Sequence, residues 1–319
     1  MRDAVLRIGT QAVAACVFLL LIAGALVTST QSGLAVPDWP LSYGKVMPPM
    51  VGGILFEHGH RLVAAAVSTL VGLELGALLF FMEGRKTVKR LAAAAFAAIL
   101  LQALLGGLTV LFLLPPAVSS AHAGLAQIVF ALTATVALMY SKTWADLTAR
   151  PLPFEENLRF SSNVSDARRA FRWVVFATAA IYLQIILGAV MRHTGAGLAI
   201  PDFPTSFGGV FPSLEEISRS GVPIHFAHRI GALAVVLLVF LAARAVSSLP
   251  GAHPLFVPAA AFWAGLVCLQ ALLGAASVWS GKAVSVTVAH LAGGALCWVT
   301  GVLLSVALAA GFSVKLARD

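Results

Sequence analysis

The chain has few charged residues: Lys, Arg, Asp and Glu make up only 11% of its 319 residues. A soluble domain carries about 25% charged residues, so this composition excludes an ordinary soluble globular protein. Cysteine is also scarce, and Cys16, Cys268 and Cys297 all fall inside long apolar runs, which argues against a structural disulfide. Hydrophobic residues make up 60% of the chain, which excludes an intrinsically disordered protein.

Long apolar runs fill most of the sequence. A helix needs about 20 residues to cross roughly 30 Å of hydrocarbon, and eight runs are long enough. They predict transmembrane helices at residues 8–28, 54–82, 91–114, 120–140, 173–191, 225–246, 256–278 and 284–310. The first run begins with basic residues like a signal peptide, but it is too long for one and lacks a suitable cleavage site. The sequence therefore predicts an all-α, multi-pass integral membrane protein.

Basic residues are concentrated in alternate connections between these runs. Fifteen of the 21 lie on one predicted side: Arg2, Arg7, Arg85, Lys86, Lys89, Arg90, Lys142, Arg150, Arg159, Arg168, Arg169, Arg172, Arg244, Lys315 and Arg318. Because basic loops stay on the cytoplasmic side, we expect both termini to be cytoplasmic and the protein to lie in the cell (inner) membrane. The net charge of +8 is then a consequence of topology, so no nucleic-acid partner is expected.

The sequence contains an internal duplication. Residues 57–61 match 225–229, residues 102–106 match 270–274, and residues 121–122 match 289–290, all at an offset of 168; residues 33–40 match 197–204 at an offset of 164. The second outer loop is thus four residues longer. Each half has four spans, an even number, so the halves insert with the same orientation as parallel repeats.

This duplication predicts two four-helix bundles. We expect an N-terminal half at residues 1–140, a cytoplasmic linker at 141–172 that contains Pro151 and Pro153, and a C-terminal half at 173–319.

Four of the eight histidines occupy repeat-matched positions: His60, His122, His228 and His290. Each lies within about two turns of the outer end of an even-numbered helix, inside a membrane span where polar groups are costly. A lone histidine there is most simply explained by a hydrogen bond to nearby backbone. Two pairs at one depth instead favour ligands. Zinc sites use three or four ligands, whereas two opposed imidazoles suit a haem iron.

Other residues near these histidines allow two interpretations each. The glycines and alanines beside the sites fit a flat macrocycle and ordinary helix packing equally well. Arg61 and Arg229 directly follow a histidine and are candidate partners for haem propionates, or extend to the membrane interface. Glu57 lies one turn before His60, where it is a candidate catalytic carboxylate or a helix-start acid favoured by the helix dipole. Its repeat counterpart is His225.

Three blocks of residues together resemble one known family. They are Glu57-x-x-His60-Arg61, Ala121-His122-Ala123-Gly124 and the stretch 188–204 after the fifth span. In this order and topology they resemble the haem A synthases, bacterial relatives of the mitochondrial enzyme, and the resemblance covers nearly the whole chain. Haem O synthases carry Asp-rich motifs that are absent from this sequence.

The resemblance implies an enzyme, a membrane oxidoreductase that oxidises the C8 methyl group of haem O to the formyl group of haem A for terminal oxidases. It implies that His60 and His122 ligate the substrate haem, that His228 and His290 bind the iron of a haem b cofactor, and that Glu57 is catalytic. Expected partners are haem O, membrane lipid, an electron donor and haem O synthase; an oligomer is compatible with the sequence. Many members carry a cysteine pair in the first outer loop, where this chain has none.

Two other classes of protein stay open at this point. A dihaem electron carrier of the cytochrome b kind would use the same histidine pairs without chemistry on its haem. A transporter is the third hypothesis, because parallel repeats are common among transporters. His58, His193 and His253 have no matching histidine, and we interpret them as loop or interface residues, with His193 and Arg192 placed where they could reach a propionate.

Overall fold

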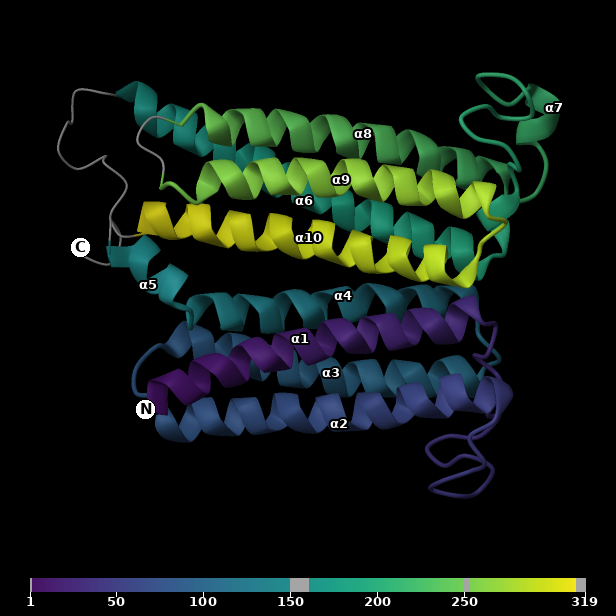
Figure 1. Ribbon diagram of the computed structural model, residues 1–319, viewed down its shortest axis with the longest axis horizontal. Helices are drawn as coiled ribbons and strands as arrows, with labels where there is room; N and C mark the ends of the chain where they lie inside the picture. The colour runs from purple at the N-terminus through teal and green to yellow at the C-terminus, as the bar shows by residue number, and fades with distance from the viewer. Residues whose placement is uncertain (1, 150–160, 250–252, 314–319) are drawn as a thin grey trace.

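The computed structural model describes residues 2–149, 161–249 and 253–313, and its regular elements there are helices (Figure 1). The long helices are α1 (Arg2–Ser29), α2 (Gly52–Phe81), α3 (Lys86–Leu111), α4 (Pro116–Met139), α6 (Ser161–His193), α8 (Val222–Ser247), α9 (Phe256–Trp279) and α10 (Val284–Ser313). All eight are long and apolar enough to cross a membrane, which confirms the predicted multi-pass, all-α fold. Away from its ends, a helix pairs its backbone N–H and C=O groups internally, as hydrocarbon surroundings require.

The helices form two groups that lie side by side along one long axis (Figure 1). In the first group α1 packs against α2, α2 against α3, α3 against α4, and α4 against α1. In the second group the same closed order runs through α6, α8, α9 and α10. Consequently α2 and α4 are diagonally opposed in the first ring, and α8 and α10 are diagonally opposed in the second.

Helices α4 and α10 join the two groups. They pack against each other, and each also packs against the first helix of the other group, α4 against α6 and α10 against α1. Of the most apolar 18 residues in each helix, 56% are buried in α4 and 44% in α10, against 22–28% in the other six helices. The outer six helices therefore expose most of their apolar surface, as expected for contact with lipid.

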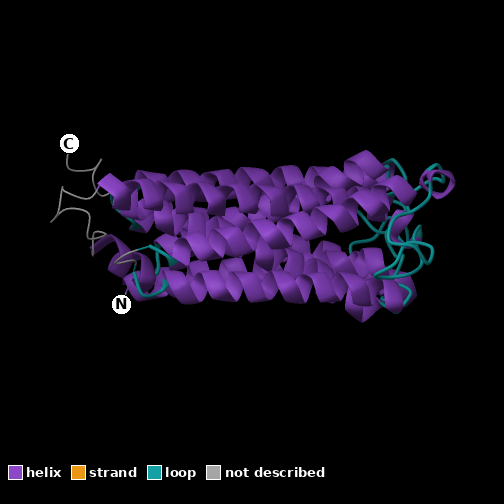
Figure 2. Ribbon diagram, turned by 90° about the horizontal axis from the view of Figure 1, so that it is seen from above, coloured by secondary structure: helices purple, strands orange, loops and turns teal. Residues whose placement is uncertain are grey.

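Long connections gather at one end of the bundle, which we call the loop end (Figure 2). Residues 30–51 and 194–221 lie there, and the second connection holds the short elements η1 (Ala196–Leu198) and α7 (Leu214–Ile217). The start of α1 and the last described turn of α10 lie at the opposite end (Figure 1). The three cysteines are free, as the sequence predicts.

Helix boundaries differ from the prediction at the inner connection. The expected linker contains the short helix α5 (Lys142–Ala149) and the first turns of α6, which starts at Ser161 and not at residue 173. Apolar runs reveal only the part of a helix inside hydrocarbon, whereas helix-favouring charged residues extend α6 beyond it, with Arg169 paired to Asp166 at 3.0 Å. Pro151 and Pro153 lie outside the described residues, and the domain boundaries stay a prediction.

Candidate functional site

The structure places the four repeat-matched histidines near the loop end, inside both rings. His60 is eight residues after the first residue of α2, and His122, His228 and His290 are each six residues after the first residue of α4, α8 and α10. Each pair therefore occupies diagonally opposed helices at a similar depth. His60 lies near His122, and His228 lies near His290.

A glycine on a neighbouring helix makes room for each of these imidazoles. A Cβ atom added to Gly24, Gly106, Gly188 or Gly274 would lie 3.2, 3.1, 2.9 or 3.2 Å from the Cε1 atom of His60, His122, His228 or His290, respectively. Contacts this short are tighter than side chains normally make, so a larger residue would displace the ring. The glycines follow the same repeat offsets as the rest of the chain, 164 from Gly24 to Gly188 and 168 from Gly106 to Gly274.

Several imidazole nitrogens are buried without a protein partner. Nδ1 of His60, His122 and His290 lacks a hydrogen bond among the described residues. Such atoms are uncommon in folded proteins, so these rings are candidates for contact with a bound group. No group of three or more His, Cys, Asp and Glu residues comes together in the described part of the chain. Each half offers two imidazoles, a donor set that would suit a haem iron.

Glu57 lies at the edge of the first site, where both its carboxylate oxygens are engaged. The residue is 4% exposed. Oε2 accepts a hydrogen bond from the Val36 backbone N–H at 2.8 Å, and Oε1 pairs with the Arg61 guanidinium at 2.6 Å. In the second half, His225 Nδ1 accepts from the Ile200 backbone N–H at 3.2 Å. Val36 and Ile200 are repeat counterparts, so Glu57 and His225 anchor the same point of their loops.

The two arginines that follow the histidines bind loop carbonyls in matching patterns. The partners of Arg61 are the carbonyls of Val36, Asp38 and Leu41, and those of Arg229 are the carbonyls of Ile200, Asp202 and Thr205. Each partner pair is separated by 164 residues. Arg61 additionally bonds Glu57, whereas the buried Nε of Arg229 lacks a partner among the described residues. The arginines thus hold the loops over the sites, and their propionate role stays a prediction.

Two aspartates shape the loops, and sequence reasoning did not single them out. Asp38 accepts hydrogen bonds from the backbone N–H groups of Tyr43 and Gly44, and Asp202 from those of Phe207 and Gly208. The N–H groups of Gly44 and Tyr43 lower the pKa of Asp38. Partial burial raises the pKa of Asp202, but hydrogen bonds from Thr205 and from the loop backbone outweigh it and lower the pKa to about 2. The sequence Pro-Asp-aromatic-Pro, which occurs at residues 37–40 and again at 201–204, is the pattern from which these two aspartates could have been predicted.

The remaining histidines make local contacts. His58 Nδ1 lies 2.7 Å from the hydroxyl of Ser42, a fully buried residue in the first loop. The repeat counterpart of His58 is Phe226. His253 Nε2 lies 3.2 Å from Asp146 on α5, at the end opposite the loops. His193 closes α6, and its neighbour Arg192 donates to Ser29 Oγ at 2.7 Å, which links the two groups of helices.

Glu74 is a buried carboxylate in α2 that the sequence analysis did not single out. Its side-chain oxygens have no hydrogen-bond partner among the described residues, and its repeat counterpart is Ala242. Glu74 is 14 residues beyond His60, about 21 Å along the helix, so it lies outside the first site.

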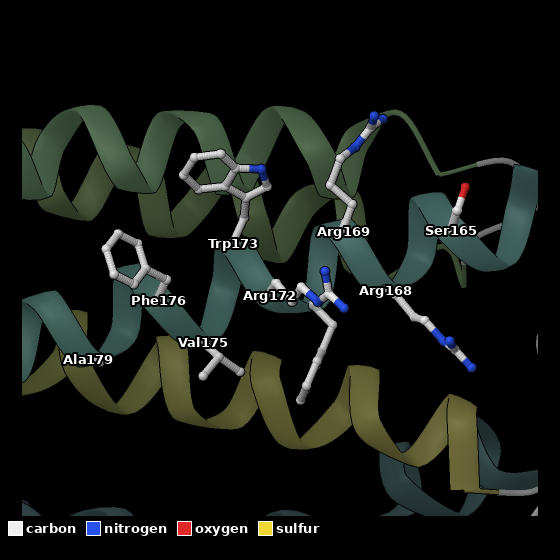
Figure 3. Close-up of a pocket in the computed structure, with 9 residues that line it drawn as sticks. Ser165, Arg168, Arg169, Arg172, Trp173, Val175, Phe176 and Ala179 are labelled. Atoms are coloured by element: carbon white, nitrogen blue, oxygen red, sulfur yellow. The ribbon is translucent and has the colours of Figure 1, made fainter.

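One large hollow lies away from the histidines. A cavity of about 1020 Å³ opens beside the first turns of α6, where Arg168, Arg169 and Arg172 extend next to Trp173 and Phe176 (Figure 3). The face of α6 that contacts His228, at Gly188, lies 16 residues beyond Arg172. This hollow therefore belongs to the opposite end of the bundle and not to the histidine sites.

The fold and its histidine pairs define a class: multi-pass helical membrane proteins with a pair of histidines in each group of four helices. Comparison with known proteins narrows this class. The family of cytochrome oxidase assembly proteins matches residues 51–302, so the chain belongs to that family. It is 33% identical over 241 residues to a heme A synthase of Symbiobacterium thermophilum (73% of each chain), and 30% identical over 282 residues to one of Bacillus pumilus (85% of each). A heme A synthase of Bacillus cereus is 27% identical over 285 residues, 85% of this chain and 83% of its own.

Proposed function

We propose that the protein makes haem A by oxidising the C8 methyl group of haem O to a formyl group, with haem b as its resident cofactor. Membership of a family that includes heme A synthases supports the haem A synthase function. One observation carries the chemistry: each half has two imidazoles on diagonally opposed helices, each cradled by a glycine. Two sites of one design allow one porphyrin to react while the other transfers electrons.

The N-terminal half is the proposed substrate site, with His60 and His122 as ligands of the haem O iron. Its Glu57–Arg61 ion pair supports this assignment, because the second half has His225 in place of the carboxylate. Glu57 is the proposed catalytic carboxylate, which receives a proton as the methyl group is oxidised or stabilises positive charge there. To do so it must exchange its bond to Val36 or Arg61 for one to the substrate.

The C-terminal half is the proposed haem b site, held by His228 and His290. Haem b supplies a reversible one-electron couple when bound. The protein positions that couple through α4 and α10, which carry His122 and His290 and pack directly against each other between the halves. Arg61 and Arg229 hold the loops that cover the sites, and we propose that they also lie near the propionates.

We propose a location in the cell membrane with both termini in the cytoplasm. The eight spans support a multi-pass membrane protein, and the bias of basic residues supports the orientation. The loop end would then face outwards. Conversion of a methyl group to a formyl group removes electrons and adds an oxygen atom, so the reaction needs an oxidant and a source of oxygen from outside the protein. An electron donor and haem O synthase are the other proposed partners.

A dihaem electron carrier is the second candidate, and one contact favours it. Glu57 and His225 bind equivalent loop N–H groups, so Glu57 has a structural role that needs no catalysis. The two functions differ in what happens to haem O.

Pigment extraction after expression with and without a haem O supply tests the proposal. Haem A that appears only with the supply is the expected result. Haem b alone under both conditions would assign the protein to the carriers, and the absence of any porphyrin would refute both candidates.

A further inference from the structure

Three of the four histidines receive a second contact from the helix that carries their glycine. The side-chain amide Nε2 of Gln102, Gln184 and Gln270 donates a hydrogen bond to the backbone carbonyl of His122, His228 and His290, at 2.9, 2.7 and 2.7 Å respectively. In each case the glutamine precedes the cradling glycine by four residues. Both residues therefore lie on one face of their helix, one turn apart. We call this pair of contacts the Gln–Gly clasp.

His60 is the exception. Gly24 cradles its ring as the other glycines do, but the residue four positions earlier is Leu20, whose side chain cannot donate a hydrogen bond. Leu20 and Gln184 are counterparts at the offset of 164, as are Gly24 and Gly188. The missing clasp is thus a difference between the halves at one position.

The repeat counterpart of His60 is the most firmly held of the four. Gln184 Nε2 lies 2.7 Å from the carbonyl oxygen of His228 and also 3.0 Å from its ring Nδ1. Gln102 Nε2 lies 3.4 Å from ring Nε2 of His122. Nδ1 of His60, like that of His122 and of His290, has no partner among the described residues, and no glutamine contacts the His60 backbone carbonyl. Contacts around a ligating histidine fix its orientation and strengthen binding of the metal. A histidine without them reorients more easily.

This difference matches the tasks of the two halves. A resident cofactor must stay bound through many turnovers, whereas a substrate porphyrin must enter and its product must leave each time. We propose that His60 is the yielding ligand through which porphyrin enters and leaves the N-terminal half, and that the Gln–Gly clasp on His228 keeps haem b resident. This inference rests on the proposed function of the two halves.

A reciprocal pair of substitutions tests it: Leu20→Gln adds the missing donor, and Gln184→Met removes the donor while nearly preserving side-chain length. The readout is the rate at which holoprotein loaded with haem b in both halves transfers haem to excess apomyoglobin. The wild type should release haem in a fast and a slow phase. His122→Ala should remove the fast phase and His290→Ala the slow one, which assigns each phase to a half.

We expect Gln184→Met to accelerate the slow phase about tenfold or more, and Leu20→Gln to slow the fast phase by a similar factor. Gln127→Leu is the matched control, because Gln127 is a buried amide on α4 that donates to no histidine among the described residues. It should change neither phase. Gln102→Met and Gln270→Met should accelerate release from their own halves alone, since both clasps are present.

Unchanged rates in both Leu20→Gln and Gln184→Met, with haem bound, would overturn the clasp and leave the proposed function intact. Equal effects of Gln127→Leu and Gln184→Met would overturn it as well, because loss of any buried amide would then suffice. A wild type that binds no haem in either half would overturn the proposed function and this inference with it.

Discussion

The two halves share a scaffold down to single hydrogen bonds and differ at a few positions that face the sites. Arg61 and Arg229 bind three equivalent carbonyls each, and Asp38 and Asp202 close equivalent turns. Near the histidines the differences are Glu57 against His225 and Leu20 against Gln184. The comparison teaches that the repeated contacts hold each histidine pair and the loop above it in the same way, and that the proposed division of function between the halves depends on the unmatched residues near the histidines.

The histidine pairs should give the largest effects. His228→Ala and His290→Ala should each remove most haem b from the purified protein, because one imidazole cannot hold the iron as two do. His60→Ala and His122→Ala should abolish haem A formation and leave the haem b content near that of the wild type. Extracted pigments, quantified by absorbance, measure both quantities. His253→Ala is the control, since His253 contacts Asp146 far from the sites; equal haem loss in all five variants would remove the division between the halves.

Glu57→Gln should have the second largest effect on haem A formation. The amide keeps one hydrogen-bond acceptor for Val36 but removes the negative charge, so haem A formation should fall by about 10²- to 10⁴-fold if the carboxylate takes part in proton transfer. Haem b content should not change. The counterpart His225→Gln should leave haem A formation almost intact. Similar modest losses in both variants would show that Glu57 only anchors its loop.

Substitution of the cradling glycines should weaken binding by about 10- to 100-fold. Gly188→Val places side-chain atoms where the His228 ring lies, 2.9 Å from its Cε1, and should lower haem b affinity; Gly24→Val should raise the apparent Km for haem O without loss of haem b. Gly265→Val on α9 is the matched control, because an added Cβ there meets no atom within 4 Å. Haem titration of each purified variant provides the measurement. Equal losses in Gly265→Val would mean that any bulky residue disturbs the bundle.

The loops should give the smallest effect, visible only in acid. Asp202 has a pKa lowered to about 2, so its stabilising contribution is present above the unfolded value near 4 and is lost as the pH falls towards 2. The pKa of Asp38 is lowered as well, but Asp38 lacks a counterpart to the Thr205 hydroxyl, which lies 2.6 Å from Asp202. We therefore expect residues 30–51 to loosen at a higher pH than residues 194–221. Hydrogen exchange of the two loops against pH measures this order, and simultaneous loosening would contradict it.

Much of this architecture could be predicted from the sequence because membrane spans and repeats leave long-range patterns. Apolar run lengths predicted the eight spans, and constant offsets placed His60 with His228 and His122 with His290. The recurrence of residues 102–106 at 270–274 was visible as well, but its meaning was not. Only the structure shows that Gln102 and Gly106 contact one histidine, because that contact joins two helices.

The roles of loop residues were less accessible for the same reason. Glu57 and His225 are chemically different, so comparison of the two repeats suggests different roles for them. In the structure both accept a hydrogen bond from the backbone N–H at the same loop position. The carbonyl partners of Arg61 and Arg229 are backbone atoms, which no side-chain pattern reveals. Helix ends beyond the hydrocarbon, as in α6, were missed because charged residues interrupt apolar runs without interrupting the helix.

Electron paramagnetic resonance of the oxidised wild-type protein, supplied with haem O, tests the central claim most directly. Two distinct low-spin ferric signals of the bis-imidazole type, one lost in His290→Ala and the other in His122→Ala, are the predicted result. A single haem signal that survives in both variants, or iron without imidazole coordination, would contradict the assignment of one porphyrin to each half.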